Sequence, residues 1–369
     1  MLVRDHYVPV LTGKAGEFAA LESLAPNVLR SLSPLIDMPP ISLPPPPRPG
    51  EEPRSPDPPE KRLGQLLRSV ATRWGNKRRV IVDLAAYDRY SINGRHPAEW
   101  LFERGSDAGV WLMACAATDS SPRYLEALVN SATSLKGMCL RARIRPGQDP
   151  SETVTAIDAL SSSLPRSDPA HTVLMLDLCR IDPHGERDIV VAQSVVEHLR
   201  ALRAGGRVVH AVTGTSMPED IPRGGPTRVR RREWRLWQQL AGEPLAATAA
   251  FADYGITGPR PEDDAFRPGP APHLRYTTPA ALMLWRGRKD ADADPEDPER
   301  RAVLFPELCR ELVLGHRDHF CGSPFSAGDR GIWDAACGKQ KPGNATKWIE
   351  FATSHHITLV VRQLQRRSV

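Results

Sequence analysis

Residues 172–212, TVLMLDLCRIDPHGERDIVVAQSVVEHLRALRAGGRVVHAV, decide the fold class. The stretch opens with a short apolar run, continues with apolar residues at helical spacing over 188–204, and closes with a second apolar run from 207. Gly205-Gly206 follows the helical segment, where a helix carboxyl end favours glycine. The pattern predicts a strand–helix–strand unit, which is typical of a parallel sheet in an α/β protein.

The same alternation extends over residues 7–253. Short apolar runs predict eight strands, at 7–11, 34–37, 79–84, 109–114, 137–144, 172–178, 207–212 and 248–253. Helical spacing predicts seven helices between them, at 17–24, 61–74, 97–103, 122–134, 152–160, 188–204 and 231–241. This number of strands and helices predicts a (β/α)8 TIM-like barrel. An open, doubly wound sheet is the alternative, because the number of strands does not show whether a sheet closes.

The sequence predicts two parts. Residues 1–258 form the barrel-like domain, interrupted by the proline-rich insertion PPISLPPPPRPGEEPRSPDPP at 39–59. Proline lacks a backbone donor, so we expect this insertion to be extended or disordered and to serve as a tether or as a docking segment for a protein partner. Residues 259–369 are expected to form an α+β extension packed on the barrel. Its predicted elements are strand structure within 273–288, helices at 299–314 and 333–337, and a closing strand at 357–364.

Composition excludes several classes of protein. The 369 residues are 40% hydrophobic, which is enough for a substantial core. No apolar stretch reaches the roughly 20 residues of a membrane helix, and the amino terminus lacks the features of a signal peptide. The six cysteines contain no CxxC pair, which favours reduced, buried thiols over a zinc or dithiol motif. These features predict a cytoplasmic protein.

Three predicted strands end in an aspartate: Asp37, Asp83 and Asp177. Barrel active sites lie at the carboxyl ends of the strands, so these side chains are candidates for catalysis at one mouth. They could carry out acid–base chemistry or hold a divalent metal, although no ligand spacing indicates a metal and no cofactor is identified. Aspartate after a strand also caps helices and forms turns, and that interpretation stays open. Candidate ligand-binding residues follow other strands: Lys14, Glu17, Arg143 and Ser216.

Two further polar clusters stand out. His355-His356 precedes the predicted closing strand, and only one of two adjacent strand residues can face a site. A basic cluster surrounds Trp234, and its guanidinium groups with an aromatic ring suit nucleic acid; its members are Arg228, Arg230, Arg231, Arg232 and Arg235. The alternative is a solvated helix face with Trp234 and Trp237 turned into the core. Phosphate loops and the common hydrolase motifs GxSxG and HExxH are missing from the sequence.

Segments near both ends of the chain resemble a known family. YVPVLTGKAGEFAAL at 7–21 and LSPLID at 32–37 are similar to the start of the beta family of proteins, named after a phage beta protein. FSAGDRGI at 325–332, GNATKW at 343–348 and HHIT at 355–358 resemble its carboxyl-terminal signature. The family occurs in bacteria and their phages and has no established reaction. The matched residues are Lys14, Glu17, Asp37, Asp329, Asn344, Trp348, His355 and His356.

Three hypotheses for function follow. The resemblance and the basic cluster suggest a component of a bacterial antiphage-defence or phage-encoded system that contacts nucleic acid. Alternatively, the protein is an enzyme acting on a nucleotide or phosphorylated small ligand at the barrel mouth. The third hypothesis is a structural subunit whose proline-rich segment docks a partner in a multiprotein complex. If the two matched ends serve one site, His355 or His356 should approach the mouth beside Lys14, Glu17 and Asp37, with Asp329 as a further ligand-binding residue.

Overall fold

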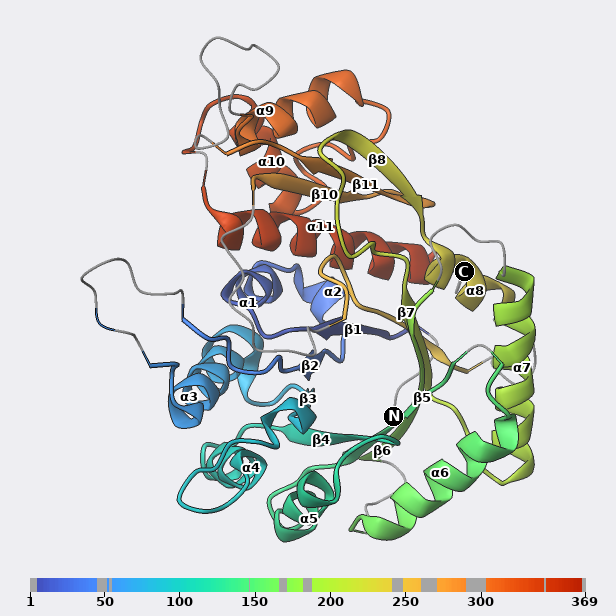
Figure 1. Ribbon diagram of the computed structural model, residues 1–369. Coiled ribbons are helices and arrows are strands. Elements are labelled where there is room, and N and C mark those ends of the chain that lie inside the picture. The colour runs from blue at the N-terminus through green and yellow to red at the C-terminus, as the bar shows by residue number, and fades with distance from the viewer. Residues whose placement is uncertain are drawn as a thin grey trace.

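The computed structural model describes residues 5–44, 52, 55–145, 147–165, 171–181, 188–240, 248–259, 271–289, 303–341 and 343–366. Residues 45–51, 53 and 54 of the proline-rich insertion lie outside these residues. Figure 1 shows a barrel encircled by helices, with a small sheet beside it.

Eight parallel strands form a closed barrel, which confirms the predicted (β/α)8 TIM-like architecture and rules out the open sheet. The strands follow one another around the barrel in chain order, and the last pairs with the first. They are β1 (Tyr7–Leu11), β2 (Leu35–Asp37), β3 (Val80–Asp83), β4 (Leu112–Ala117), β5 (Met138–Arg143), β6 (Thr172–Arg180), β7 (Ala211–Thr215) and β9 (Ala250–Asp253). Because side chains alternate along a strand, every second residue points into the barrel. Val8, Leu35, Ile81 and Met175 are among those that fill it.

Seven helices follow the strands as the sequence predicts, with shifts of a few residues at their ends. Pro97, Pro122 and Pro150 begin three of them, because proline suits the first helical turn. The helices are α1 (Ala15–Glu22), α3 (Pro59–Ser69), which continues into a π-helical turn (Val70–Gly75), α4 (Pro97–Asp107), α5 (Pro122–Asn130), α6 (Pro150–Ser163), α7 (Asp188–Ala204) and α8 (Arg232–Leu240). A short helix, α2 (Pro26–Leu29), precedes β2.

A three-stranded antiparallel sheet forms the accessory layer. Its order is β10 (His273–Thr277), β11 (Ala281–Arg286) and β8 (Gly224–Arg230). Helices α9 (Phe305–Arg310) and α10 (Ala327–Ala336) share a hydrophobic cluster with this sheet. The strand β8 lies between β7 and α8 in sequence, so the barrel segment itself contributes an edge strand to the accessory sheet.

The predicted strand at 357–364 is wrong, because these residues belong to α11 (Ala345–Gln365). Ile357, Val360, Val361 and Leu364 lie at i, i+3, i+4 and i+7, which is a helical stripe, and all four join the main hydrophobic core. The β-branched residues within 357–364 are typical of a strand, and this composition is the reason for the wrong prediction. Figure 1 shows α11 between α8 and α1, in the place of the eighth helix of the ring. The carboxyl-terminal segment therefore completes the barrel, and does not simply pack on it.

None of the helices in the described parts of the chain is both long and apolar enough to cross a membrane.

Candidate active site at the barrel mouth

Asp37, Asp83 and Asp177 converge inside the barrel around one guanidinium group. Arg141 of β5 donates from Nε to Asp177 Oδ2 (2.8 Å), and from Nη1 to Asp37 Oδ2 (2.8 Å) and Asp83 Oδ2 (3.2 Å). Its Nη2 donates to the Tyr254 hydroxyl (2.6 Å), which in turn donates to Asp177 Oδ2 (2.7 Å). One arginine therefore links the carboxyl ends of three strands.

Strand register brings these groups together. Asp37 of β2 lies directly beside Asp83 of β3, and Asp177 of β6 lies beside Arg143 of β5. All of them occupy inward positions of the pleat. Asp83 and Asp177 also accept hydrogen bonds from the backbone two residues further along the chain, from Ala85 N (2.9 Å) and Cys179 N (2.8 Å) respectively. Asp83 and Asp177 therefore form turns and also belong to the charged cluster around Arg141.

Burial alone would lower the pKa of Arg141, but Tyr254, Asp177 and Asp37 more than compensate, and the pKa lies well above its ordinary value. Burial also raises the pKa of Tyr254 well above 10, so its hydroxyl keeps its proton at neutral pH. The cluster is therefore an arginine cation held among three aspartates and a protonated tyrosine.

A metal does not fit among the three aspartates, because the Arg141 guanidinium lies between them. In the described ranges, no group of three His, Cys, Asp or Glu side chains is arranged to hold a metal ion.

A cavity of about 1520 Å³ opens above this cluster. Asp37, Arg141 and Tyr254 reach it from below, and charged side chains from several strand ends surround it. The basic ones are Lys14, Arg143, Arg145 and Arg180; the acidic ones are Asp119, Glu152, Glu219 and Asp220.

Two of the basic groups at the cavity are paired with carboxylates. Arg143 donates to Asp119 (2.6 Å), and Arg180 lies 3.2 Å from Glu219. Lys14 forms no ion pair with any described carboxylate. Desolvation by the surrounding protein lowers the pKa of Lys14, although the residue remains exposed to solvent.

Cys179 lines the cavity with an unusual backbone. Its φ of 52° lies in the left-handed region, which side chains other than glycine seldom adopt. Such a conformation is held only where the surroundings impose it, and it is commonest at functional sites. Burial, followed by the nearby Asp177 charge, raises the pKa of the thiol to about 11, so Cys179 is not a thiolate at neutral pH.

A family model described as Beta protein matches residues 7–362. The chain belongs to the Beta protein family. The match runs from the first residue of β1 into the last turns of α11, and so includes both the barrel and the accessory sheet. A comparison with curated proteins finds no match.

In this Beta protein, the two histidines of the resemblance lie away from the cavity. His356 of α11 donates from Nε2 to Asp253 (3.1 Å), which also accepts a bond from the Tyr7 hydroxyl, and its Nδ1 contacts the Thr277 hydroxyl (2.8 Å). Both His356 and Asp253 are buried beneath α11, outside the barrel. Burial lowers the pKa of His356. Burial alone would raise the pKa of Asp253, but His356 and Arg231 outweigh it, so the pKa of Asp253 lies below its ordinary value.

His355 forms a second sealed pair. Its Nδ1 lies 2.9 Å from Asp329 Oδ2 and its Nε2 lies 2.7 Å from the Thr277 carbonyl oxygen. The ring stacks on Tyr276 at 3.9 Å. Both ring nitrogens therefore have a partner within the fold. Together the two histidines clasp α11 to β1, β9 and the accessory sheet, and neither meets Lys14 or Asp37 at the mouth.

Two of the remaining ligand-binding candidates are internal. Glu17 accepts bonds from the backbone of Thr12 (3.0 Å) and Lys14 (2.8 Å), and so fixes the turn that presents Lys14 to the cavity. Ser216 donates to Glu233 and accepts from Arg232 N (2.9 Å), so its hydroxyl is used within the fold.

The basic cluster is divided between surface and interior. Arg228, Arg230 and Arg235 are exposed, whereas Arg231 and Arg232 are buried. Trp234 and Trp237 stack on each other, with 5.3 Å between ring centroids, within the main hydrophobic core. Both rings lie on the hydrophobic face of α8, which packs against the barrel. They therefore present no exposed surface on which a nucleic-acid base could stack. The structure therefore favours the packing interpretation for both tryptophans.

Sequence reasoning did not select Arg141 and Tyr254, which organise the floor. The available signal was two arginines, Arg141 and Arg143, at alternate positions of an otherwise apolar strand. A buried charge of that kind requires partners, and the strand-end aspartates were the obvious ones.

Proposed function

We propose that this Beta protein is an enzyme that binds a nucleotide or another small phosphorylated ligand in the barrel mouth. The observation that carries the proposal is the charged cavity above the Arg141 cluster, at the end of the barrel where such folds place their chemistry.

The distribution of cations supports an anionic ligand. Lys14 follows β1, whereas Arg143 and Arg180 end β5 and β6. In a closed ring of eight strands, β1 and β5 stand opposite each other, so basic groups face the cavity from two sides. A ligand with phosphate groups would meet guanidinium donors on one side and an ammonium group on the other.

The floor supports acid–base chemistry. Of the three clustered aspartates, Asp37 lines the cavity, while Asp83 and Asp177 hold Arg141 from behind. We assign Asp37 the role of general base toward a ligand hydroxyl, and Arg141 the role of fixing that carboxylate and stabilising negative charge.

The test is a panel of nucleoside mono-, di- and triphosphates and sugar phosphates, screened for binding by calorimetry and for turnover by phosphorus NMR. Arg143→Gln should weaken binding by tenfold or more, and Asp37→Asn should retain binding but lose turnover. Arg200→Gln, on the exposed face of α7, is the matched control and should behave like the wild type. Absence of binding for every phosphorylated compound in the panel would overturn the proposal.

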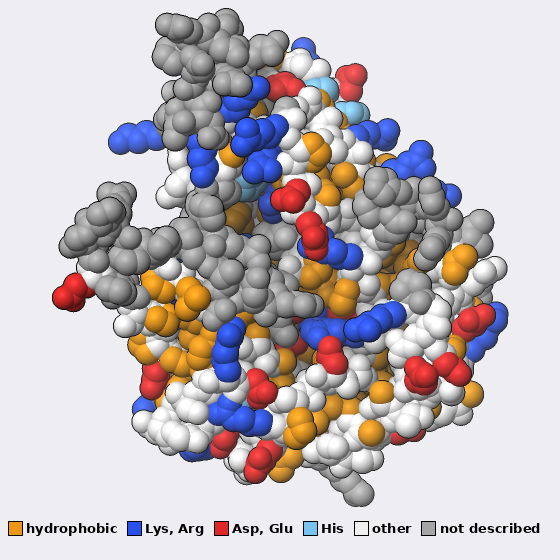
Figure 2. All heavy atoms as spheres, in the orientation of Figure 1, with side chains coloured by type: hydrophobic (Ala, Val, Ile, Leu, Met, Phe, Trp, Pro, Cys, Tyr) orange, Lys and Arg blue, Asp and Glu red, His pale blue; other side chains and the backbone are white. Residues whose placement is uncertain are grey.

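Nucleic-acid contact is the second candidate, favoured by the three exposed arginines of β8 and α8. Figure 2 shows basic and acidic side chains interspersed over one face of the molecule, so any such contact would be local. Replacing Arg228, Arg230 and Arg235 by Gln should lower the slope of log affinity against log salt by about 2 to 3, at roughly 0.7 to 0.9 per phosphate contact. An unchanged slope would exclude these residues as the contact. A role in phage–host conflict stays a prediction from the family resemblance, and a docking role of residues 39–59 stays a prediction from sequence.

A further inference from the structure

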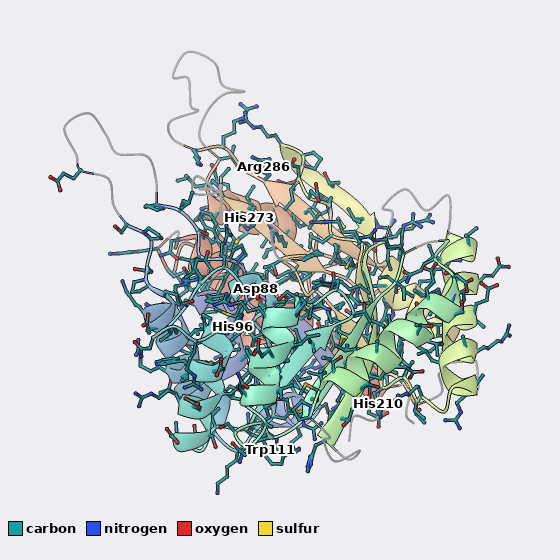
Figure 3. All side chains as sticks on the ribbon, turned by 60° about the horizontal axis from the view of Figure 1, so that its bottom comes forward. Asp88, His96, Trp111, His210, His273 and Arg286 are labelled. Atoms are coloured by element: carbon teal, nitrogen blue, oxygen red, sulfur yellow. The ribbon has the colours of Figure 1, made fainter. Side chains whose placement is uncertain are left out.

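A second cavity lies at the opposite end of the barrel from the mouth. Its volume is about 230 Å³, and it is lined by His6, Ser33, Lys77, Arg79 and Trp111. These residues stand just before the strands β1, β2, β3 and β4. Because the strands are parallel, their amino-terminal ends gather at one end of the barrel. In Figure 3, Trp111 lies at the far end of the molecule from His273 and Arg286 of the accessory sheet.

The polar groups that line this cavity are mainly basic. Neither Lys77 nor Arg79 forms an ion pair with a carboxylate in the described ranges. Burial lowers the pKa of Arg79, and no neighbouring carboxylate raises it. Burial and the Arg79 charge also lower the pKa of His6, against the opposing effect of Asp5. Among the described residues, its buried Nδ1 has no hydrogen-bond partner. A buried imidazole nitrogen without a partner is costly, and a ligand donor or acceptor would satisfy it.

Trp111 adds an aromatic surface beside these cations. Its side chain is 36% exposed, although tryptophan is usually more buried. The ring contacts His171 edge-on at 6.0 Å between centroids, and this contact orients it at the rim. Cations beside an exposed indole are the combination that recognises a phosphate attached to a flat base.

We propose that this cavity is a second ligand site, which binds a nucleoside monophosphate independently of the mouth. Lys77 and Arg79 hold the phosphate, His6 and Ser33 supply hydrogen bonds, and Trp111 stacks on the base. The barrel separates this site from the cavity at the mouth, so its occupancy does not depend on the ligand or the reaction proposed there.

The test is calorimetric titration of the full chain with AMP, GMP, CMP and UMP, and with inorganic phosphate and adenosine as separate arms. The mouth variant Arg143→Gln serves as the background, so that binding at the mouth does not mask the second site. On that background at least one nucleoside monophosphate should bind, more tightly than phosphate or adenosine. Adding Lys77→Gln or Trp111→Ala should each reduce that affinity by tenfold or more.

The side chain of Lys77 is exposed, so this variant should keep the wild-type thermal unfolding temperature, which separates loss of binding from loss of fold. Equal affinity for inorganic phosphate and the monophosphates would overturn the role of Trp111 and with it the nucleotide site. Absence of binding on the Arg143→Gln background, or binding insensitive to both added substitutions, would also overturn the proposal. None of these results depends on whether the mouth binds a phosphorylated ligand.

Discussion

At the scale of single residues, the buried aspartates at the mouth depend on Arg141 for their compensation. Three carboxylates lie inside a parallel barrel, and each is at most 3% exposed at the side chain. Removing carboxylates from water is costly unless a cation and hydrogen bonds compensate. Arg141 supplies both, through donors aimed at all three groups. The same arrangement holds Asp37 in one orientation toward the cavity.

Arg141→Met should therefore destabilise the protein strongly. It retains much of the side-chain volume but leaves three buried carboxylates without their cation, and breaking a buried ion pair costs about 3 to 5 kcal/mol. Urea denaturation should show this loss in the free energy of unfolding. Arg68→Met, at an exposed position of α3, should change it by less than about 0.5 kcal/mol. A stability of Arg141→Met within about 1 kcal/mol of the wild type would contradict the assigned role of the guanidinium.

At the scale of elements, the crossing of α1 and α11 joins the two ends of the family signature. A β-carbon on Gly16 would lie 2.3 Å from the carbonyl oxygen of Thr346, and one on Gly328 would lie 2.0 Å from that of Phe351. Helices α1 and α10 thus approach the backbone of α11 at positions where only glycine fits. The clasp formed by His355 and His356 then fixes α11 against β9 and β10. Within the matched segments, Gly16 and Gly328 therefore share a packing role with His355 and His356.

Gly16→Ala should test that crossing. The added methyl group meets backbone, which cannot move aside as a side chain can, so we expect a loss of about 1 to 3 kcal/mol. Gly64→Ala is the matched control, because the nearest atom to its new β-carbon is the flexible Arg68 side chain at 3.5 Å. There alanine should be neutral or should stabilise α3 by up to about 1 kcal/mol. Thermal and urea unfolding of the two variants would measure the difference, and equal effects would disprove the close-packing argument.

At the scale of the whole molecule, a buried polar network connects the barrel to the accessory sheet. Arg231 follows β8, and its Nη1 donates to Gln363 of α11 (2.8 Å) and lies 3.4 Å from the Thr278 carbonyl oxygen. Glu233, the next acidic residue, accepts bonds from the backbone and hydroxyl of Ser216 at the end of β7. Burial raises the pKa of Glu233 to about 7, against the opposing effects of Arg231 and Ser216.

This network predicts a pH dependence of stability. The folded state holds the Glu233 proton up to about pH 7, whereas the unfolded chain releases it near pH 4.3. The contribution of Glu233 is therefore greatest below about pH 4 and is lost as the pH rises through 7, by an amount on the order of 3 kcal/mol. Glu233→Gln should remove this fall, measured as the difference in unfolding free energy between pH 5 and pH 8. Glu197→Gln, exposed on α7, should keep the wild-type profile. If both Glu233→Gln and Glu197→Gln retain the fall in unfolding free energy, another group is responsible for the pH dependence.

The sequence by itself determined the alternation of strands and helices and the residues that could form a mouth, and it left the closed barrel and the open sheet as alternatives. Each predicted strand and helix depended on local periodicity, which is visible within ten or twenty residues. The convergence of Asp37, Asp83 and Asp177 followed from the parallel order, because parallel strands end at the same side of the sheet.

Only the tertiary structure decided how those residues are used. That β8 leaves the barrel for the accessory sheet, and that α11 completes the ring as its eighth helix, depends on contacts between segments far apart in the chain. At least one of His355 and His356 was expected near the mouth, but α11 turns them toward Asp329 and Asp253 on its buried side. Local patterns specify which surfaces of a segment are apolar. Where those surfaces are buried, and therefore which charges must pair, is set by long-range packing.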